Sequence, residues 1–188
     1  MDVTRFDEVA AGVEKLQMHG RIDAATTGSL LLKPAVSTSE SEWQATIAAN
    51  LTSAFSVVRA CSQAMIGQGG SIVLVSSAAA RIGIANHEAI AAAKAGVIGL
   101  TLSAAATYGP RGIRVNCVAP GLVRTPLTTR LTSNDASLKA STAMHALGRI
   151  GDVADVASAI DWLLNAEQSW VTGQVLGIDG GLGSLRTR

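Results

Sequence analysis

Aromatic residues are scarce in this sequence: its 188 residues include three Trp, two Phe and one Tyr. A folded core must therefore be built from Ala, Val, Leu and Ile, and the 48% hydrophobic content is sufficient for one. Charge is balanced, because 15 basic and 14 acidic residues leave a formal charge of +1. With neither a basic run nor interleaved aromatic residues, the sequence does not predict a nucleic-acid-binding surface.

Cysteine is also rare. Cys61 and Cys117 are too few for a disulfide framework, so we expect both to be small buried hydrophobic side chains. The first eight residues are polar and acidic, unlike a secretory leader. The longest uncharged stretch, residues 95–110, contains glycine, serine and threonine and falls short of a membrane span. We therefore expect one cytoplasmic domain over residues 1–188, with no membrane segment and no metal site.

The stretch from Ser71 to Tyr108 organises the chain. Residues 71–77, Ser-Ile-Val-Leu-Val-Ser-Ser, are typical of a strand in a sheet covered on both faces. Active sites of open α/β sheets lie beyond the carboxyl ends of their strands, so we expect a site just past Ser77. A helix is predicted over 86–108 with Asn86 as its N-cap. It carries Lys94 among apolar residues, where a cation needs a partner, a ligand or water.

The rest of the chain alternates between helical and strand patterns. In the helix predicted over 40–65, capped by Ser39 and Glu42, the buried face is expected to hold Trp43, Ile47, Leu51, Phe55 and Val58. The polar segment 126–141 is typical of a mobile substrate lid. The other predicted elements are helices 4–18, capped by Thr4 and ended by His19-Gly20, and 152–165, capped by Asp152, with strands near 22–25, 113–118 and 174–178.

These motifs resemble the short-chain dehydrogenase/reductase family. Asn50, Ser77 and Lys94 match that family's asparagine, serine and lysine, whereas Ile90 stands at its tyrosine position, thirteen residues after the serine and four before the lysine. Segments 112–121 and 170–181, which contain Ile-Arg-Val-Asn…Pro-Gly and Thr-Gly…Asp-Gly-Gly, carry the most specific part of the resemblance. It implies an α/β fold, an incomplete Rossmann-like doubly wound parallel sheet.

The resemblance also implies an oxidoreductase that uses NAD or NADP to act on a carbonyl or an alcohol. In relatives the tyrosine donates a proton, the lysine lowers the tyrosine pKa and binds ribose, the serine binds the substrate oxygen, and the asparagine holds a water. The implied coenzyme contacts of this chain are Lys94, Pro120, Gly121, Val123 and Thr125.

The family's opening strand, glycine-rich turn and helix, which hold the pyrophosphate, lie upstream of the residue that matches Asp2. This is the pattern expected if the true start precedes Met1. Gly28 matches the glycine that follows the family's next strand but arrives about two residues early, so that strand is expected to be short or missing.

Isoleucine cannot donate a proton, so we expect the family's catalysis to be weakened or lost in this chain. His87, three residues before Ile90, is a candidate substitute acid, and the alternative is a histidine exposed at the cleft mouth. Three functions stay open. The chain is a weakened oxidoreductase, a non-catalytic subunit that oligomerises, or a small-molecule binding module that uses Ser77, Lys94 and Thr125. We expect a homo-oligomer formed through the helices 40–65 and 86–108.

Overall fold

The computed structural model describes residues 2–17, 23–25 and 28–186. Its centre is a parallel four-stranded sheet in the order β1-β2-β3-β4. The strand predictions are confirmed, although β1 has only three residues and the start of its predicted range, Ile22, lies outside the described residues. The strands are β1 (Asp23–Ala25), β2 (Gly70–Val75), β3 (Ile113–Pro120) and β4 (Val175–Ile178).

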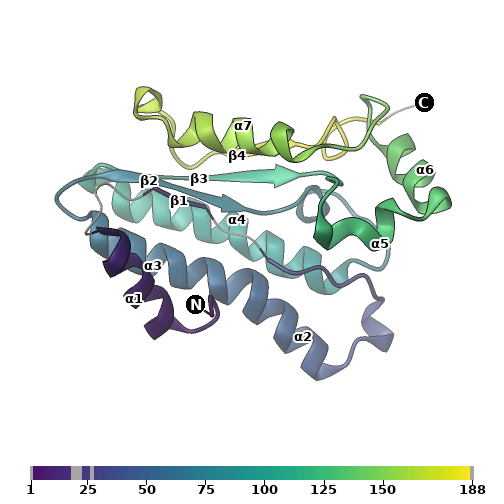
Figure 1. The fold of residues 1–188 in the computed structure, drawn as a ribbon, viewed down its shortest axis with the longest axis horizontal. Helices are drawn as coiled ribbons and strands as arrows, with labels where there is room; N and C mark the ends of the chain where they lie inside the picture. The colour runs from purple at the N-terminus through teal and green to yellow at the C-terminus, as the bar shows by residue number, and fades with distance from the viewer. Residues whose placement is uncertain (1, 18–22, 26–27, 187–188) are drawn as a thin grey trace.

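Helices cover both faces of this sheet, which confirms the predicted Rossmann-like α/β class (Figure 1). On one face lie α3 (Ser53–Met65) and α4 (Glu88–Tyr108), with α1 (Phe6–Gln17) packed against α3. On the other face lies α7 (Val153–Leu164). Near the carboxyl ends of the strands are α5 (Thr129–Thr132) and α6 (Asp135–Met144).

The sheet's side chains alternate between two apolar cores, as the two-residue period of a strand requires. Ile72 and Leu74 of β2 face α3 and α4, whereas Val73 packs with Leu163 of α7. Cys61 and Cys117 are buried and unpaired, as predicted. Burial raises the pKa of Cys61 to about 11 and also raises that of Cys117, so both thiols stay neutral at physiological pH.

Helix α4 is the most apolar element of the fold. By length and composition alone, residues 88–111 would suffice to cross a membrane. In the structure, Ala93, Val97 and Ala104 of this helix are buried, and α4 contacts β3. Such burial is typical of the central helix of a globular domain.

The helix predicted over 40–65 is interrupted. A π-helical turn, Ala48–Thr52, separates α2 (Glu40–Ile47) from α3, and Asn50 lies within it. The predicted buried face was partly wrong, because Trp43 is 40% and Phe55 46% exposed. Phe55 packs against Phe6 of α1 with ring centroids 5.8 Å apart, and smaller residues of α3 face the sheet instead.

Two predicted helix starts were also wrong. Asn86 has a φ of 62°, and the N-cap of α4 is His87. The Thr4 hydroxyl donates to Asp2 instead of capping α1, which begins at Phe6. The segment 126–141, predicted as a substrate lid, contains α5 and most of α6. The Asn134 side chain caps α6 by accepting a hydrogen bond from the Ser137 N–H group. The helix stop predicted at His19-Gly20 lies outside the described residues.

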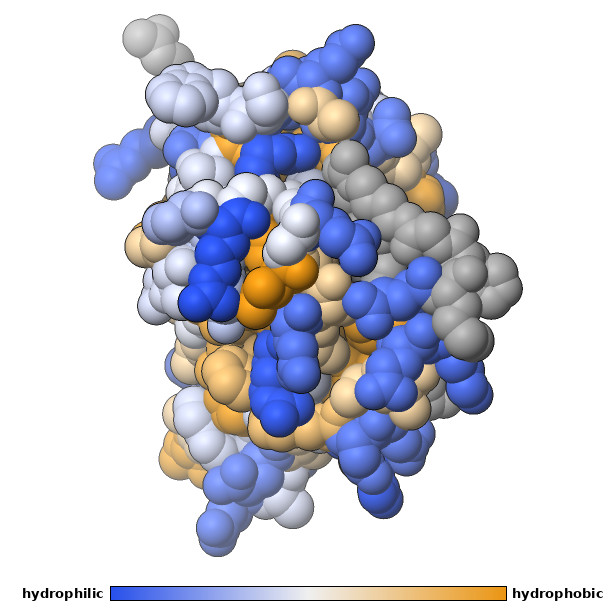
Figure 2. All heavy atoms as spheres, turned by 90° about the vertical axis from the view of Figure 1, so that its left-hand side faces the viewer, coloured by the Kyte–Doolittle hydropathy of each residue, from blue (hydrophilic) through white to orange (hydrophobic). Residues whose placement is uncertain are grey.

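Figure 2 shows the end of the molecule where the strands begin, with hydrophilic side chains dispersed among smaller apolar areas. A hollow of about 570 Å³ there is lined by four glycines, Trp170 and several small or polar residues. Its charged side chain, Arg114, donates hydrogen bonds to the carbonyls of Leu163 and Val171. Because these hydrogen bonds tie Arg114 to the backbone, the described residues of the hollow offer no clear ligand-binding charge. The polar groups predicted to act together lie at the opposite end of the sheet.

Candidate active site

Strands β2 and β3 end side by side, with Val75 paired to Val118. The Ser76 hydroxyl donates to the Lys94 carbonyl at 2.8 Å, which fixes α4 against the strand end. The Ser77 hydroxyl accepts a hydrogen bond from the Ala79 N–H group at 3.1 Å. Because a serine hydroxyl both donates and accepts, Ser77 can still donate its proton to a ligand oxygen.

A cavity of about 190 Å³ lies at this edge of the sheet. Its lining brings together five residues of the sequence prediction: Ser77, His87, Ile90, Pro120 and Gly121. The cavity lies below the roughly 300–1,000 Å³ typical of drug-sized ligands, and no Lys, Arg, Asp or Glu side chain lines it, so it suits a small uncharged molecule. Apolar side chains supply most of the remaining wall, among them Leu30, Leu32, Leu131, Met144 and Leu182.

Ile90 is 3% exposed and forms part of this wall. At the position where the family resemblance places an ionisable phenol, the cavity therefore meets a hydrocarbon.

Lys94 is the buried cation of α4, at 6% exposure. Its ammonium donates to the Val75 carbonyl at 2.9 Å. Burial lowers the pKa of Lys94 to about 8, because desolvation penalises the charged form. Lys94 is not among the residues that line the cavity, although it lies one helical turn after Ile90 and its ammonium is hydrogen-bonded to the backbone two residues before Ser77.

Asn50 is 1% exposed, and its side-chain amide is bound on both sides. Its Nδ2 donates to the Thr46 carbonyl and the Ser29 hydroxyl, and its Oδ1 accepts from the Ser29 N–H group at 3.1 Å. A Cβ on Gly28 would overlap Asn50 Oδ1 and lie 3.0 Å from Lys94 Nζ. The glycine at position 28 thus lets the chain pass close to the side chains of Asn50 and Lys94. These two polar side chains lie together outside the cavity lining.

The segment after β3 holds the other predicted coenzyme contacts. Gly121 lines the cavity, whereas Val123 pairs with Gly151 through a backbone bridge and lies outside the lining. The Thr125 hydroxyl is hydrogen-bonded to the Thr128 hydroxyl at 3.1 Å, and it too lies outside the lining. The five predicted coenzyme residues therefore do not converge on one cavity.

His145 is a cavity residue that the sequence analysis missed. It is 3% exposed; its Nδ1 donates to the Ser141 carbonyl at 2.7 Å, and its Nε2 accepts from the Leu122 N–H group at 3.2 Å. With Gly121 and Leu122, it also lines a neighbouring cavity of about 430 Å³. Its sequence context gave no signal, because it follows a polar segment with no motif around it.

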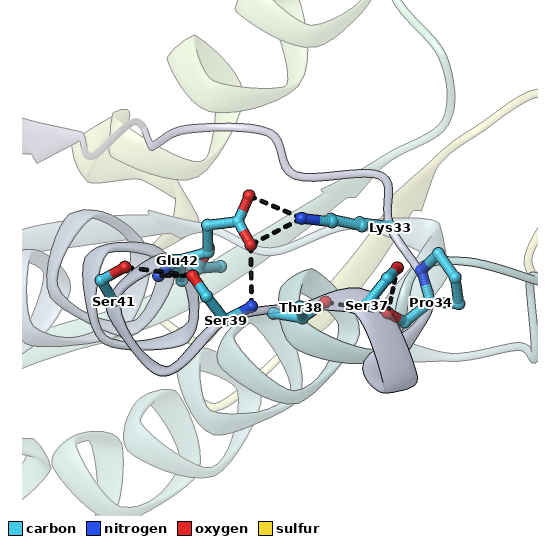
Figure 3. A network of polar contacts seen from close by, with 8 residues as sticks. Lys33, Pro34, Ser37, Thr38, Ser39, Ser41 and Glu42 are labelled. Atoms are coloured by element: carbon cyan, nitrogen blue, oxygen red, sulfur yellow. Dashed lines mark hydrogen bonds and ion pairs between the residues drawn. The ribbon is translucent and has the colours of Figure 1, made fainter.

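One wall of the cavity is a loop that an ion pair holds in place (Figure 3). Lys33 donates to both carboxylate oxygens of Glu42, at 2.9 and 2.8 Å, and Glu42 also accepts from the Ser39 N–H group. The Lys33 ammonium and the Ser39 N–H group lower the pKa of Glu42 to about 2. This network ties the loop to α2, and with it Leu30 and Leu32 of the cavity wall.

Among the five predicted coenzyme residues, which do not share one cavity, Lys94 offers hydrogen-bond donors for the nicotinamide end of NAD or NADP. Lys94 has three N–H donors, of which one is given to the Val75 carbonyl, so it could still bind ribose hydroxyls. For a pyrophosphate, the described residues contain no glycine-rich turn that leads from a strand into a helix. Within the described part of the chain, no three His, Cys, Asp or Glu residues are placed to hold a metal ion.

Comparison with known proteins finds relatives that match almost the whole chain. A family model described as enoyl-(acyl carrier protein) reductase matches residues 1–183. The 3-oxoacyl-[acyl-carrier-protein] reductase FabG of Thermotoga maritima is 41% identical over 186 residues, which cover 97% of this chain and 75% of that protein.

Two solved structures are similar as well. A short-chain type dehydrogenase/reductase from Mycobacterium ulcerans has a TM-score of 0.93 at 32% identity, covering 99% of this chain and 70% of that one. A tyrosine-to-phenylalanine variant of ElxO with NADPH bound has a TM-score of 0.91 at 28% identity, covering 98% of this chain and 77% of that one.

Proposed function

The chain belongs to the short-chain dehydrogenase/reductase family, and from that membership we propose that it is an NAD(P)-dependent oxidoreductase whose phenol-dependent step is missing. Its substrate is a small uncharged carbonyl compound or alcohol. The observation that carries the proposal is Ile90, buried in the wall of the cavity that Ser77 lines. The family's substrate site is retained, but its proton donor is replaced.

The roles of the chain's own residues follow from their contacts. Ser77 orients the substrate by donating its hydroxyl proton to the carbonyl oxygen. Lys94 and the segment 120–125 would hold the nicotinamide end of the coenzyme, which supplies or accepts the hydride when bound. In ElxO, loss of one tyrosine hydroxyl is compatible with bound NADPH. By analogy, we expect coenzyme binding in this chain to survive the lack of the phenol.

Titration of the purified chain with NADH and with NADPH tests this proposal. We expect saturable binding with a Kd of about 1 mM or below, equivalent to roughly −4 kcal/mol, because the nicotinamide end alone has defined partners. Calorimetry would measure the affinity, and Lys94→Met should weaken it. Without saturation up to millimolar coenzyme, the oxidoreductase proposal fails, and the small-molecule binding module would take its place.

We also propose that the chain forms a homo-oligomer through the helices 40–65 and 86–108. Leu102 of α4 is 50% exposed, and Phe55 and Trp43 remain partly exposed on α3 and α2. Ala92, Ala95 and Gly99 continue the exposed side of α4 at helical spacing. A second copy presenting the same side of α4 would cover the exposed apolar residues of this helix around a two-fold axis.

Two glycines of α4 provide a matched test. A Cβ on Gly99 meets nothing within 4 Å, whereas one on Gly96 lies 2.7 Å from Leu51 Cδ2. In thermal unfolding, Gly99→Ala is expected to stabilise the fold by up to about 1 kcal/mol, and Gly96→Ala by less, because Leu51 must move. Gly99→Leu should keep the fold but dissociate the oligomer in light scattering. A monomeric parent chain would contradict the oligomer proposal.

A further inference from the structure

Two histidines line the cavity, and they differ in what their ring nitrogens do. Both nitrogens of His145 are engaged, one by the Ser141 carbonyl and one by the Leu122 N–H group. His87 Nδ1 lies 2.7 Å from the Ala85 carbonyl oxygen. Because a carbonyl only accepts hydrogen bonds, Nδ1 carries the proton, and in the neutral ring Nε2 keeps its lone pair. Within the described residues, no hydrogen bond to His87 Nε2 is formed.

The backbone places this imidazole at the cavity. Asn86 turns the chain through a left-handed conformation, with φ at 62°, and His87 then becomes the N-cap of α4. Ile90 follows three residues later, about one helical turn, and lines the same cavity. A base whose second nitrogen is held by a fixed acceptor is oriented as in catalytic triads, here by the Ala85 carbonyl.

We propose that Nε2 of His87 is the group that takes up and returns the substrate proton in this cavity. The proposal rests on the proposed oxidoreductase function and adds its proton-transfer residue. The substrate class is a small uncharged alcohol and its carbonyl product, because the cavity lining is mostly apolar and holds no acidic or basic residue other than histidine.

The reaction moves one proton and one hydride in each direction. In oxidation, the O–H bond of the alcohol would break and its proton would go to Nε2, leaving a carbonyl compound and an imidazolium. In reduction, the imidazolium would return its proton to the oxygen. A bound nicotinamide dinucleotide would accept the hydride of the carbinol carbon in the first direction and supply it in the second. The Ser77 hydroxyl donates a hydrogen bond to the same oxygen in both directions.

A nuclear magnetic resonance experiment tests the contact without coenzyme. In the ¹⁵N-labelled chain, the His87 ring is expected as the Nδ1–H tautomer. Cyclohexanol should shift Nε2 of His87 saturably while leaving His145 unchanged, and Ser77→Ala should weaken the binding several-fold. If cyclohexanol shifts the Ile90 methyl groups but not His87 Nε2, or does not bind, the inference is overturned. Coenzyme affinity is measured separately, so this result does not depend on it.

Turnover in paired variants gives a second readout. His87→Asn keeps a donor for the Ala85 carbonyl but removes Nε2, so the loop conformation is preserved. We expect it to lower turnover about 10²-fold in the parent chain, the lower range for a positioned acid or base. In an Ile90→Tyr background, the phenol can transfer the proton instead. There, His87→Asn should lower turnover by about tenfold or less. Equal losses in the two backgrounds would overturn the inference.

Discussion

Replacing Ile90 by tyrosine is expected to raise kcat/KM for carbonyl reduction by about 10² to 10⁴ in a chain that carries His87→Asn. This corresponds to roughly 3–5 kcal/mol of transition-state stabilisation. The new phenol would stand in the wall of the Ser77 cavity, four residues before the buried cation of Lys94. A nearby ammonium favours the phenolate, so the hydroxyl becomes a better acid. Where the His87 imidazole is intact, the gain should be smaller.

The matched control is Ile90→Phe, which adds the ring without its hydroxyl. Initial rates with NADPH and a small ketone should rise for tyrosine and stay at the parent level for phenylalanine. Adding Lys94→Met to the tyrosine variant should cancel most of the gain. If phenylalanine accelerates the reaction as much as tyrosine does, the effect comes from cavity shape, and the role assigned to the missing phenol is wrong.

Removing the Lys94 ammonium is expected to stabilise the fold. Burial lowers the pKa of Lys94 from 10.5 to about 8, and this shift corresponds to a cost of about 3 kcal/mol for holding the charged form in the native state. Lys94→Met keeps the length of the side chain and removes the charge. Urea unfolding at pH 7 should therefore show a gain of about 1–3 kcal/mol, reduced by the lost hydrogen bond to the Val75 carbonyl.

The pH dependence of this gain identifies its cause. Below pH 8, Lys94 is charged in both the native and the unfolded states, so the cost is constant. Between pH 8 and 10.5 the native state releases the proton while the unfolded state keeps it, so the parent chain gains stability as pH rises. The advantage of Lys94→Met should shrink over that interval. The exposed Lys139 provides a control, since Lys139→Met should change the stability little at either pH.

The parts of the fold that follow from local chemistry were predictable. β2 holds a continuous apolar run from Ile72 to Val75, and β3 is mostly apolar with Arg114 and Asn116 between its apolar residues. Both strands were found where the pattern placed them. Ser39 with Glu42 forms a capping box at the start of α2, and Asp152 does the same for α7. Each of these patterns lies within a few neighbouring residues, so contacts with distant segments did not change the predicted element.

Other features depend on contacts between distant segments. Asn86 and His87 can each precede a helix, and only the left-handed turn at Asn86 decides which one caps α4. Phe55 follows the helical period, yet it packs on α1 instead of the sheet. For the candidate site, the family resemblance predicted Ser77 and Ile90 at one site, and both line the cavity, whereas the position of His145 has no local sequence signal.

The π-helical turn at Ala48–Thr52 has a consequence for how this helix tolerates length changes. It holds one residue more than a regular helical path would need, and Asn50 sits in that widened turn. Deleting one residue here would make the helix regular and leave its two ends in nearly the same phase. The same deletion in the regular part of α2, after Glu42, would rotate everything before it by about 100° around the axis. Glu42 would then point away from Lys33, and the loop carrying Leu30 and Leu32 would lose its anchor. The widened turn is thus the place where this helix can lose a residue without disturbing the contacts at its two ends.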